Sequence, residues 1–282
     1  MTEKIVMVTG ANSGIGRMTA RDLAKKGYTV VMVCRNEAKG VAIMDDINAE
    51  VGVDRAHLLI ADLSDKNSLR SMSEDFKRKY DKLDVLVNNA GVMVRELQKT
   101  EDGIEYMMGV NHFGTFMNTH FMLESLQEAP HARIVNVASI AHHFAKLDWD
   151  NMNAEKHFSF FRQYALSKLC NIMFTKKLAS VLDKERITAN SLHPGVIGSD
   201  FWKEAFSPLI HKLSSWMMTT PERGAETSIY LASSEEVKNY TGAYFVKSKV
   251  KFPSLLASNR KQIDKLWDWS MEQMNLDKFG QV

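Results

Sequence analysis

The 282-residue sequence contains only two cysteines, Cys34 and Cys170, which are too few for a disulfide framework in a chain of this length. Both lie in apolar segments, where a buried and reduced thiol is the expected state. No uncharged apolar run reaches the roughly 18 residues that a membrane span needs, and the N-terminus lacks the pattern of a signal peptide. We therefore expect a soluble, cytoplasmic protein without a transmembrane segment.

An excess of charge of one sign is also missing. The formal net charge is +2, from 36 basic and 34 acidic residues, and no cluster of basic residues occurs. This balance excludes the strongly basic surfaces that bind nucleic acid. The sequence has no internal repeat, no low-complexity tract and no linker rich in proline or glycine. Because 45% apolar and 25% charged residues are ordinary globular values, residues 1–282 are predicted to form one domain.

Short apolar runs alternate with longer helical segments along most of the chain. The runs that predict strands are KIVMVT, YTVVMVC, AHLLIAD, LDVLVN, ARIVNVAS, ITANSLH and, later, AYFVK. The segments that predict helices are 15–26, 37–51, 66–80, about 100–128 and 161–182. Continuous apolar runs are typical of strands covered on both faces. The order predicts an α/β fold, a single-domain Rossmann-type doubly wound parallel sheet flanked by helices on both faces.

Two long segments, 141–162 and 198–220, follow the fifth and sixth predicted strands. Open α/β sheets bind ligands at the carboxyl ends of their strands, so we expect these segments to form substrate loops. A helical flap with only a packing role is the alternative. The second segment is rich in aromatic residues and methionine, which predicts an apolar binding wall and also makes it the candidate for peripheral membrane contact.

The first predicted strand ends in VTGANSGIG, with Gly10, Gly14 and Gly16 before a helix. Glycines at such a turn let the backbone approach a phosphate closely, and the N–H groups of the helix start face it. A single glycine-rich turn is weak support for this function. Its position at the start of a series of βαβ units makes dinucleotide binding the expected function.

Arg35 follows the second predicted strand. An acidic residue about 20 positions after the glycines would accept from a ribose hydroxyl of NAD. A guanidinium at this position can instead pair with a 2′-phosphate. We therefore expect NADP(H) rather than NAD(H), with Arg17 adding positive charge. A solvated loop cation is the alternative interpretation of Arg35.

Two further turns follow predicted strands at the same edge of the sheet. Asp62 is expected to accept from the adenine amino group, although capping of the next helix would also explain it. The sequence NNAG at 88–91 is expected to contact the cofactor ribose through its backbone, or else to be an ordinary turn.

Tyr164 and Lys168 stand four residues apart in YALSK, so they lie on one face of a helix. By itself, this pair is better explained as a core aromatic beside a surface charge. The cofactor turn and the residues below favour a proton donor with an ammonium beside it.

Taken together, these motifs resemble the short-chain dehydrogenase/reductase (SDR) family over nearly the whole chain. The resemblance is carried by TGANSGIG, NNAG, Asn111 in VNHFG, Ser139 after the fifth strand, YALSK and HPG at 193–195. CRN, NNAGVM, VNVASIAHH, ERGAETSIYLA and GAYF are similar to the retinol dehydrogenase-like branch. Membrane-bound members of that branch carry an apolar N-terminal segment that this sequence lacks. Ser199 stands where the family commonly has a threonine near the nicotinamide carboxamide.

The resemblance implies roles for individual residues. The expected catalytic residues are Asn111, Ser139, Tyr164 and Lys168. The residues expected to bind the cofactor are Gly10, Asn12, Ser13, Gly14, Ile15, Gly16, Arg35, Asn36, Asp62, Leu63, Asn89, Ala90, Gly91, Tyr164, Lys168, Pro194, Gly195, Val196 and Ser199. The residues expected to contact substrate are Ser139, His142, Tyr164, Phe201 and Trp202.

Tyrosine needs help to exchange protons near neutral pH, because its ordinary pKa is about 10. We expect Lys168 to lower the pKa of Tyr164, which then acts as general acid or base, while Ser139 binds the substrate oxygen. By resemblance, Asn111 holds a water in a proton relay to Lys168; an ordinary helix-interior amide is the alternative. His142 and His143 are adjacent and lack partners at ligand spacing, so we expect no metal.

The predicted function is an NADP(H)-dependent oxidoreductase that interconverts an apolar alcohol and its aldehyde or ketone. A retinoid, a lipid or a xenobiotic carbonyl would suit the apolar segments. The alternatives are a non-catalytic NADP(H)-sensing binding protein on the same fold and a reductase of small polar substrates. The long helices after the fourth and fifth strands are candidates for two-fold pairing in a homodimer.

Overall fold

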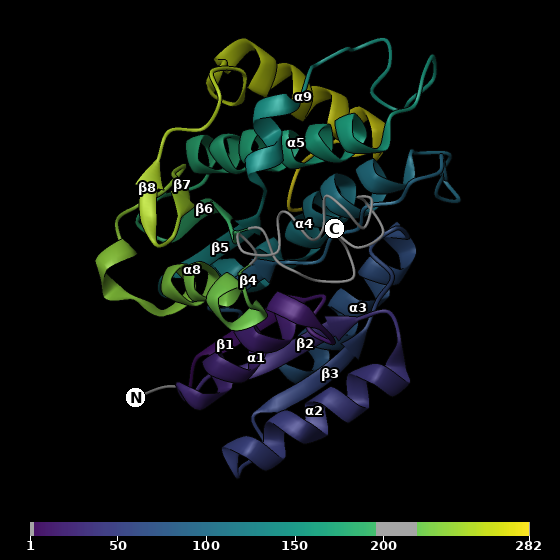
Figure 1. The fold of residues 1–282 in the computed structure, drawn as a ribbon. Coiled ribbons are helices and arrows are strands. Elements are labelled where there is room, and N and C mark those ends of the chain that lie inside the picture. Colours follow the sequence, from purple (N-terminus) through teal and green to yellow (C-terminus); the bar gives the residue numbers. More distant parts are fainter. Residues whose placement is uncertain (1–2, 196–218, 282) are drawn as a thin grey trace.

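A central sheet of eight strands organises the computed structural model, which describes residues 3–195 and 219–281 (Figure 1). The strand order is β3-β2-β1-β4-β5-β6-β7-β8. The strands are β1 (Ile5–Thr9), β2 (Thr29–Cys34), β3 (Ala56–Ile60), β4 (Val85–Asn88), β5 (Ala132–Val137), β6 (Ile187–His193), β7 (Tyr244–Val246) and β8 (Lys249–Lys251). All neighbouring pairs run parallel except β7 and β8. The predicted doubly wound fold is confirmed, and the short antiparallel strand β8 was not predicted.

Helices cover both faces of the sheet (Figure 1). The helices α1 (Gly14–Lys25), α2 (Glu37–Val51) and α8 (Pro221–Ser233) enclose one apolar core with one face of the strands. The other face packs against α3 (Lys66–Lys79), α4 (Gly114–Gln127) and α5 (Phe160–Val181). Short helices at η4 (Glu235–Val237) and η5 (Leu256–Ser258) connect the later elements. Strand β2 is buried along its whole length, as its continuous apolar run predicts.

The helix predicted over 100–128 begins later than expected. Residues before it form a turn in which Gly103 has a φ of +78°, closed by a bridge between Lys99 and Glu105. The helical path then opens with a π-helical turn, η1 (Met108–Phe113), before α4. The buried carboxylate of Glu105 accepts from the backbone N–H groups of Met107 (3.0 Å) and Met108 (2.9 Å). This cap satisfies the first free N–H groups and starts the helix there.

The C-terminal helix α9 (Arg260–Gln273) packs against α5 and touches α4 through aromatic side chains. Phe116 of α4 meets Trp267 and Phe279 at ring-centroid distances of 5.6 and 5.0 Å. Nearly every residue of α4 is buried, since the helix also packs against α3 and the sheet. The predicted two-fold pairing of the long helices in a homodimer stays a prediction.

The predicted loop segments are only partly described. Residues 141–162 begin in the 3₁₀ turn η2 (Ile140–Phe144) and lead into α5. Of the 198–220 segment, only residues 219 and 220 are described, so the predictions on Val196, Ser199, Phe201 and Trp202 lie outside the described residues. Cys34 and Cys170 are buried free thiols, as expected. None of the helices within 3–195 and 219–281 is long and apolar enough to cross a membrane.

Candidate active site

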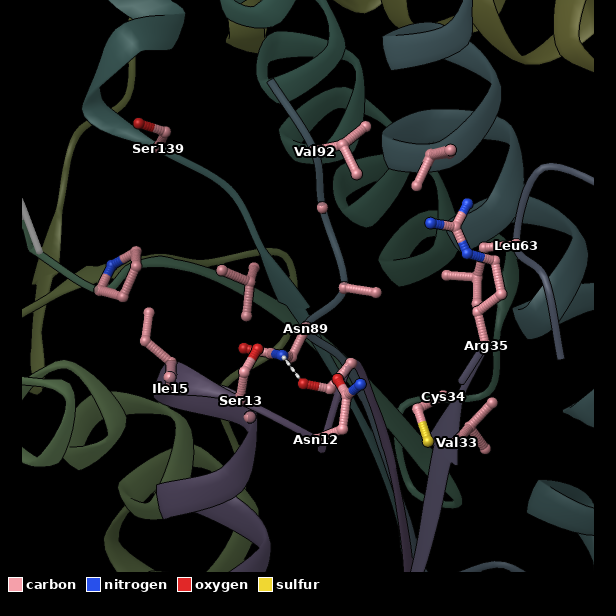
Figure 2. A pocket seen from close by; sticks show the side chains of 18 of the residues that line it. Asn12, Ser13, Ile15, Val33, Cys34, Arg35, Leu63, Asn89, Val92 and Ser139 are labelled. Carbon is pink, nitrogen blue, oxygen red and sulfur yellow. Dashed lines mark hydrogen bonds between the residues drawn. The ribbon is translucent and has the colours of Figure 1, made fainter. Parts of the chain in front are cut away.

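A cavity of about 960 Å³ opens at the carboxyl ends of the parallel strands (Figure 2). It is lined by every predicted cofactor residue that the structure describes, from Gly10 in the first turn to Gly195 after β6. Figure 2 shows Ser139 toward one end of the cavity and Arg35 toward the other, with the turn of Asn12 and Ser13 between them. The fold thus brings the separate sequence motifs to one continuous surface.

The glycine turn places bare backbone against the cavity. Gly10 has a φ of +66°, a left-handed conformation that other residues adopt only with strain. A Cβ on Gly16 would collide with the carbonyl oxygen of Gly10 and lie 2.5 Å from the Asn89 amide nitrogen. Only glycine fits at this position, and the free N–H groups at the start of α1 face the opening.

Asn89 joins this turn to the loop after β4. Its side-chain amide donates to the backbone oxygen of Thr9 at 2.8 Å, and its backbone N–H donates to the Thr9 hydroxyl at 3.0 Å. Ala90 also donates to that hydroxyl. A Cβ on Gly91 would lie 2.9 Å from the Lys168 ammonium nitrogen, so the lack of a side chain there leaves room beside Lys168.

At the other end of the cavity, Arg35 meets two partners. Its Nη1 donates to the Tyr106 hydroxyl oxygen at 2.9 Å and lies 3.5 Å from Oδ2 of Asp62. The other carboxylate oxygen of Asp62 accepts from the backbone N–H and the hydroxyl of Ser64. The cap of α3 is Asp65 rather than Asp62, since the Asp65 side chain accepts from the N–H of Asn67.

Arg17 does not contribute to this end of the cavity. Its guanidinium pairs with Asp46 on α2 at 3.2 Å, and the residue is absent from the cavity lining. The expectation that Arg17 adds positive charge there is wrong, because α2 supplies a carboxylate that sequence spacing does not reveal. Lys39, Tyr106, Val110 and His193 line the cavity and were not predicted.

Tyr164, Lys168 and Ser139 converge at the end of the cavity nearest β5. All three side chains are buried, and the hydroxyls of Tyr164 and Ser139 are hydrogen-bonded to each other. Lys168 Nζ lies 5.7 Å from the centroid of the Tyr164 ring and donates to the backbone oxygen of Val137 at 3.3 Å. The helical spacing of four residues therefore brings the phenol and the ammonium into one buried site.

Burial dominates the protonation of both groups. It raises the pKa of Tyr164 to about 12, against a smaller opposing effect of the hydrogen bond with Ser139. It lowers the pKa of Lys168 to about 8, because the charged ammonium loses water. The expected lowering of the pKa of Tyr164 by Lys168 is not observed, because burial of the phenol dominates.

Asn111 lies in the π-helical turn, next to Lys168 across Gly91. Its side-chain oxygen accepts from the N–H of Val92 at 2.7 Å, and its amide donates to the Val92 oxygen and the Ser167 hydroxyl. Its backbone carbonyl accepts from the side chain of Asn171 at 2.9 Å. The side chain therefore joins the loop after β4 to α5, and its water relay stays a prediction.

The contacts of His142 differ from the predicted contact with substrate. Its Nδ1 donates to the backbone oxygen of Ser139 at 2.7 Å, and its Nε2 accepts from the N–H of Ser254 at 3.0 Å. Both ring nitrogens are thus bonded within the protein, and the ring does not line the cavity. Burial lowers the pKa of His142 to about 4, which keeps it neutral. This arrangement does not support substrate contact by His142; the imidazole instead holds the segment that carries Ser139.

The residues present fit a nicotinamide dinucleotide. The glycine turn, whose close packing at Gly16 leaves no room for a Cβ, lines the cavity with backbone at the start of α1, which suits a pyrophosphate. Arg35 and Asp62 provide a cation and a carboxylate at the other end, and Lys168 lies beside the open space at Gly91.

The sequence is similar to a known enzyme family. Residues 4–209 match the family described as short chain dehydrogenase. Human retinol dehydrogenase 11 is 39% identical over 274 residues, which cover 97% of this chain and 86% of that protein. Human retinol dehydrogenase 14 is 37% identical over 296 residues, covering 99% of this chain and 88% of that one.

Solved structures share the fold. A crystal structure of an uncharacterized protein from Mycobacterium paratuberculosis aligns with a TM-score of 0.79 and 27% identity, over 97% of this chain and 94% of that chain. A short chain dehydrogenase from Escherichia coli CFT073, solved in complex with NADPH, aligns with a TM-score of 0.70 and 24% identity. That alignment covers 88% of this chain and 98% of the other.

Proposed function

The chain belongs to the short-chain dehydrogenase/reductase family, and on that premise we propose that it is an NADP(H)-dependent oxidoreductase of apolar alcohols and their aldehydes or ketones. One observation carries the proposal. Tyr164, Lys168 and Ser139 converge at one end of a cavity whose middle is the glycine turn.

The preference for the phosphorylated cofactor is supported by the charge after β2. Arg35 is the side chain at that position, and its guanidinium has donors that suit a 2′-phosphate. Lys39 lines the same region and adds a second cation. The Escherichia coli protein of the same fold was solved with NADPH, which agrees with this choice.

The chemistry is divided between cofactor and protein. Bound NADPH supplies the hydride that reduces a carbonyl carbon. Tyr164 donates its phenolic proton to the substrate oxygen, and takes a proton back in the direction of alcohol oxidation. Ser139 donates a hydrogen bond to that oxygen and stabilises the charge that develops on it.

Lys168 assists through its charge. A phenolate formed at Tyr164 is opposed by burial, and a protonated Lys168 at this short distance favours it. Because burial lowers the pKa of Lys168 to about 8, this ammonium is also able to pass on a proton near neutral pH. Asn111, on the other side of Gly91, is proposed to take part in the relay that restores that proton.

The apolar substrate class is supported by the surroundings of Tyr164. Its ring belongs to a cluster with Met107, Ala141 and Ala165, against which Met93 and Phe161 pack while partly buried. Next to Ser139, the exposed side chains of Ile140 and Phe144 add apolar surface. A small polar carbonyl compound would leave this surface in water, which disfavours it as the substrate.

The proposal is tested by NADPH oxidation with retinal, long-chain aldehydes, steroids and quinones. We expect turnover with at least one of them, and a loss of more than about 100-fold in kcat for Tyr164→Phe, from removal of the proton donor. Tyr240→Phe, a substitution of a half-exposed tyrosine away from the cavity, is the matched control. Two results together would favour the non-catalytic binding protein. The wild type would bind NADPH without turning over any of these compounds, and Tyr164→Phe would keep the protein's cellular role.

A further inference from the structure

Tyr106 lies at the Arg35 end of the cavity, yet no motif in the sequence marks it. Its hydroxyl oxygen accepts from Nη1 of Arg35 at 2.9 Å, and both side chains line the cavity. The two residues are far apart in the chain, so their contact depends on the fold. A guanidinium can only donate, which makes the phenol oxygen the acceptor.

The position of Tyr106 is held by its own backbone and by the residue before it. Its N–H donates to the carbonyl oxygen of Gln98 at 2.9 Å. The preceding residue, Glu105, is wholly buried and caps the N–H groups of Met107 and Met108. Tyr106 therefore stands on a fixed first helical turn, and its hydroxyl is a fixed acceptor.

Arg35 needs such a partner. Its side chain is 66% exposed, so without contacts it would sample many rotamers and lose that freedom when it binds an anion. Asp62 also lies near its Nη1, at 3.5 Å, and Ser64 fixes that carboxylate. The guanidinium is thus held between a neutral oxygen and a charged one.

The two partners have opposite consequences for an anionic ligand. The Asp62 carboxylate neutralises part of the Arg35 charge and repels a phosphate dianion. The Tyr106 hydroxyl holds the same guanidinium without adding negative charge. A neutral acceptor therefore orders the cation while leaving its charge available to the ligand.

We propose that Tyr106 is a specificity-determining positioning residue, which acts through Arg35 to favour ligands that carry a 2′-phosphate over those with a free 2′-hydroxyl. This inference rests on the proposed preference for NADP(H). Selectivity for the 2′-phosphate would then depend on Tyr106, which lies just before η1, as well as on Arg35 at the end of β2.

Binding of 2′,5′-ADP and of 5′-ADP, measured by isothermal titration calorimetry on the full chain, tests this directly. The variants are Tyr106→Phe, Arg35→Ala and the double variant, with Tyr240→Phe as the matched control. For Tyr106→Phe we expect the Kd for 2′,5′-ADP to rise roughly 10-fold, because a hydrogen bond that orders a charged group is lost. The Kd for 5′-ADP and the melting temperature should stay nearly unchanged, which a general structural defect would not allow.

The double variant shows whether Tyr106 acts through Arg35 or independently of it. In the Arg35→Ala background, Tyr106→Phe should change the Kd for 2′,5′-ADP by less than about 2-fold. Equal selectivity in wild type and Tyr106→Phe, or fully additive effects of the two substitutions, would overturn the inference. A wild-type protein that binds both nucleotides equally would instead overturn the proposed NADP(H) preference itself.

Discussion

Lys168 Nζ lies 5.7 Å from the centroid of the Tyr164 ring, and the side chains of both residues are almost completely buried. Burial acts on the two groups in opposite directions, raising the pKa of the phenol to about 12 and lowering that of the ammonium to about 8. The pKa values of the two groups, which are 10.0 for ordinary tyrosine and 10.5 for ordinary lysine, are therefore driven apart and reversed in order. In the folded protein, Lys168 loses its proton before Tyr164 does.

The buried ammonium of Lys168 predicts a pH-dependent effect of its removal. Lowering its pKa from 10.5 to about 8 corresponds to a cost of about 3 kcal/mol for the charged form in the folded state. That cost is fully present below pH 8 and disappears as pH rises toward 10.5, where the unfolded chain also loses the proton. We expect Lys168→Met to be more stable than wild type at pH 7, with the difference shrinking toward pH 10. Chemical denaturation at several pH values measures this, and a difference that grows with pH would contradict it.

Gly16→Ala is expected to abolish dinucleotide binding. The new methyl group would collide with the carbonyl oxygen of Gly10, so the turn must open at the cradle for the pyrophosphate. We expect the Kd for NADPH, measured by fluorescence titration, to rise by at least about 100-fold, as expected when about 3 kcal/mol of binding free energy is lost. Gly27→Ala is the control, because a Cβ on Gly27 would meet no atom within 4 Å and Gly27 lies away from the cavity, although its φ of +90°, unlike that of Gly16, strains an alanine. That variant should lose stability without losing the cofactor.

Four buried histidines in the described part of the chain predict sensitivity to acid. Burial lowers the pKa of His112, His120, His142 and His193 from 6.5 to about 4. Between pH 4 and 6.5 the unfolded chain binds protons that the folded chain does not. The free energy of unfolding therefore falls as the pH decreases from 6.5 to 4. Each histidine contributes a slope of about 1.4 kcal/mol per pH unit within that window. Urea denaturation between pH 4.5 and 6 measures how the free energy of unfolding changes with pH. We expect His120→Gln to reduce this slope by the equivalent of about one proton. An unchanged slope would mean that His120 is protonated in the folded state.

Much of the site follows from short stretches of sequence. The turn at Gly10–Gly16 combines local backbone freedom with the start of a helix, and YALSK places Tyr164 and Lys168 on one helical face. Because parallel strands end at one edge of a sheet, turns that follow successive strands meet there. The motifs, together with the family resemblance, therefore predicted many of the described residues that line the cavity, although not Lys39, Tyr106, Val110 or His193.

The sequence did not predict how deeply the site's side chains are buried or which distant residues they contact. The pKa values of Tyr164 and Lys168 depend on how much water the surrounding helices exclude, which four-residue spacing does not reveal. Arg17 pairs with Asp46, a residue on a different helix, and so does not reach the cavity. The long helix was predicted to start too early because Gly103, with a φ of +78°, and the bridge between Lys99 and Glu105 form a turn where the helix was expected.

By itself, the sequence determined the fold class, the cofactor turn and the Tyr164–Lys168 pair, since each depends on local backbone preferences and on residues near one another in the chain. Only the tertiary structure decided that Tyr106 holds Arg35, that His142 bonds Ser139 and Ser254, and that α9 packs against α5. Those contacts join distant segments, and their geometry is set by the packing of whole helices and strands against the two faces of the sheet.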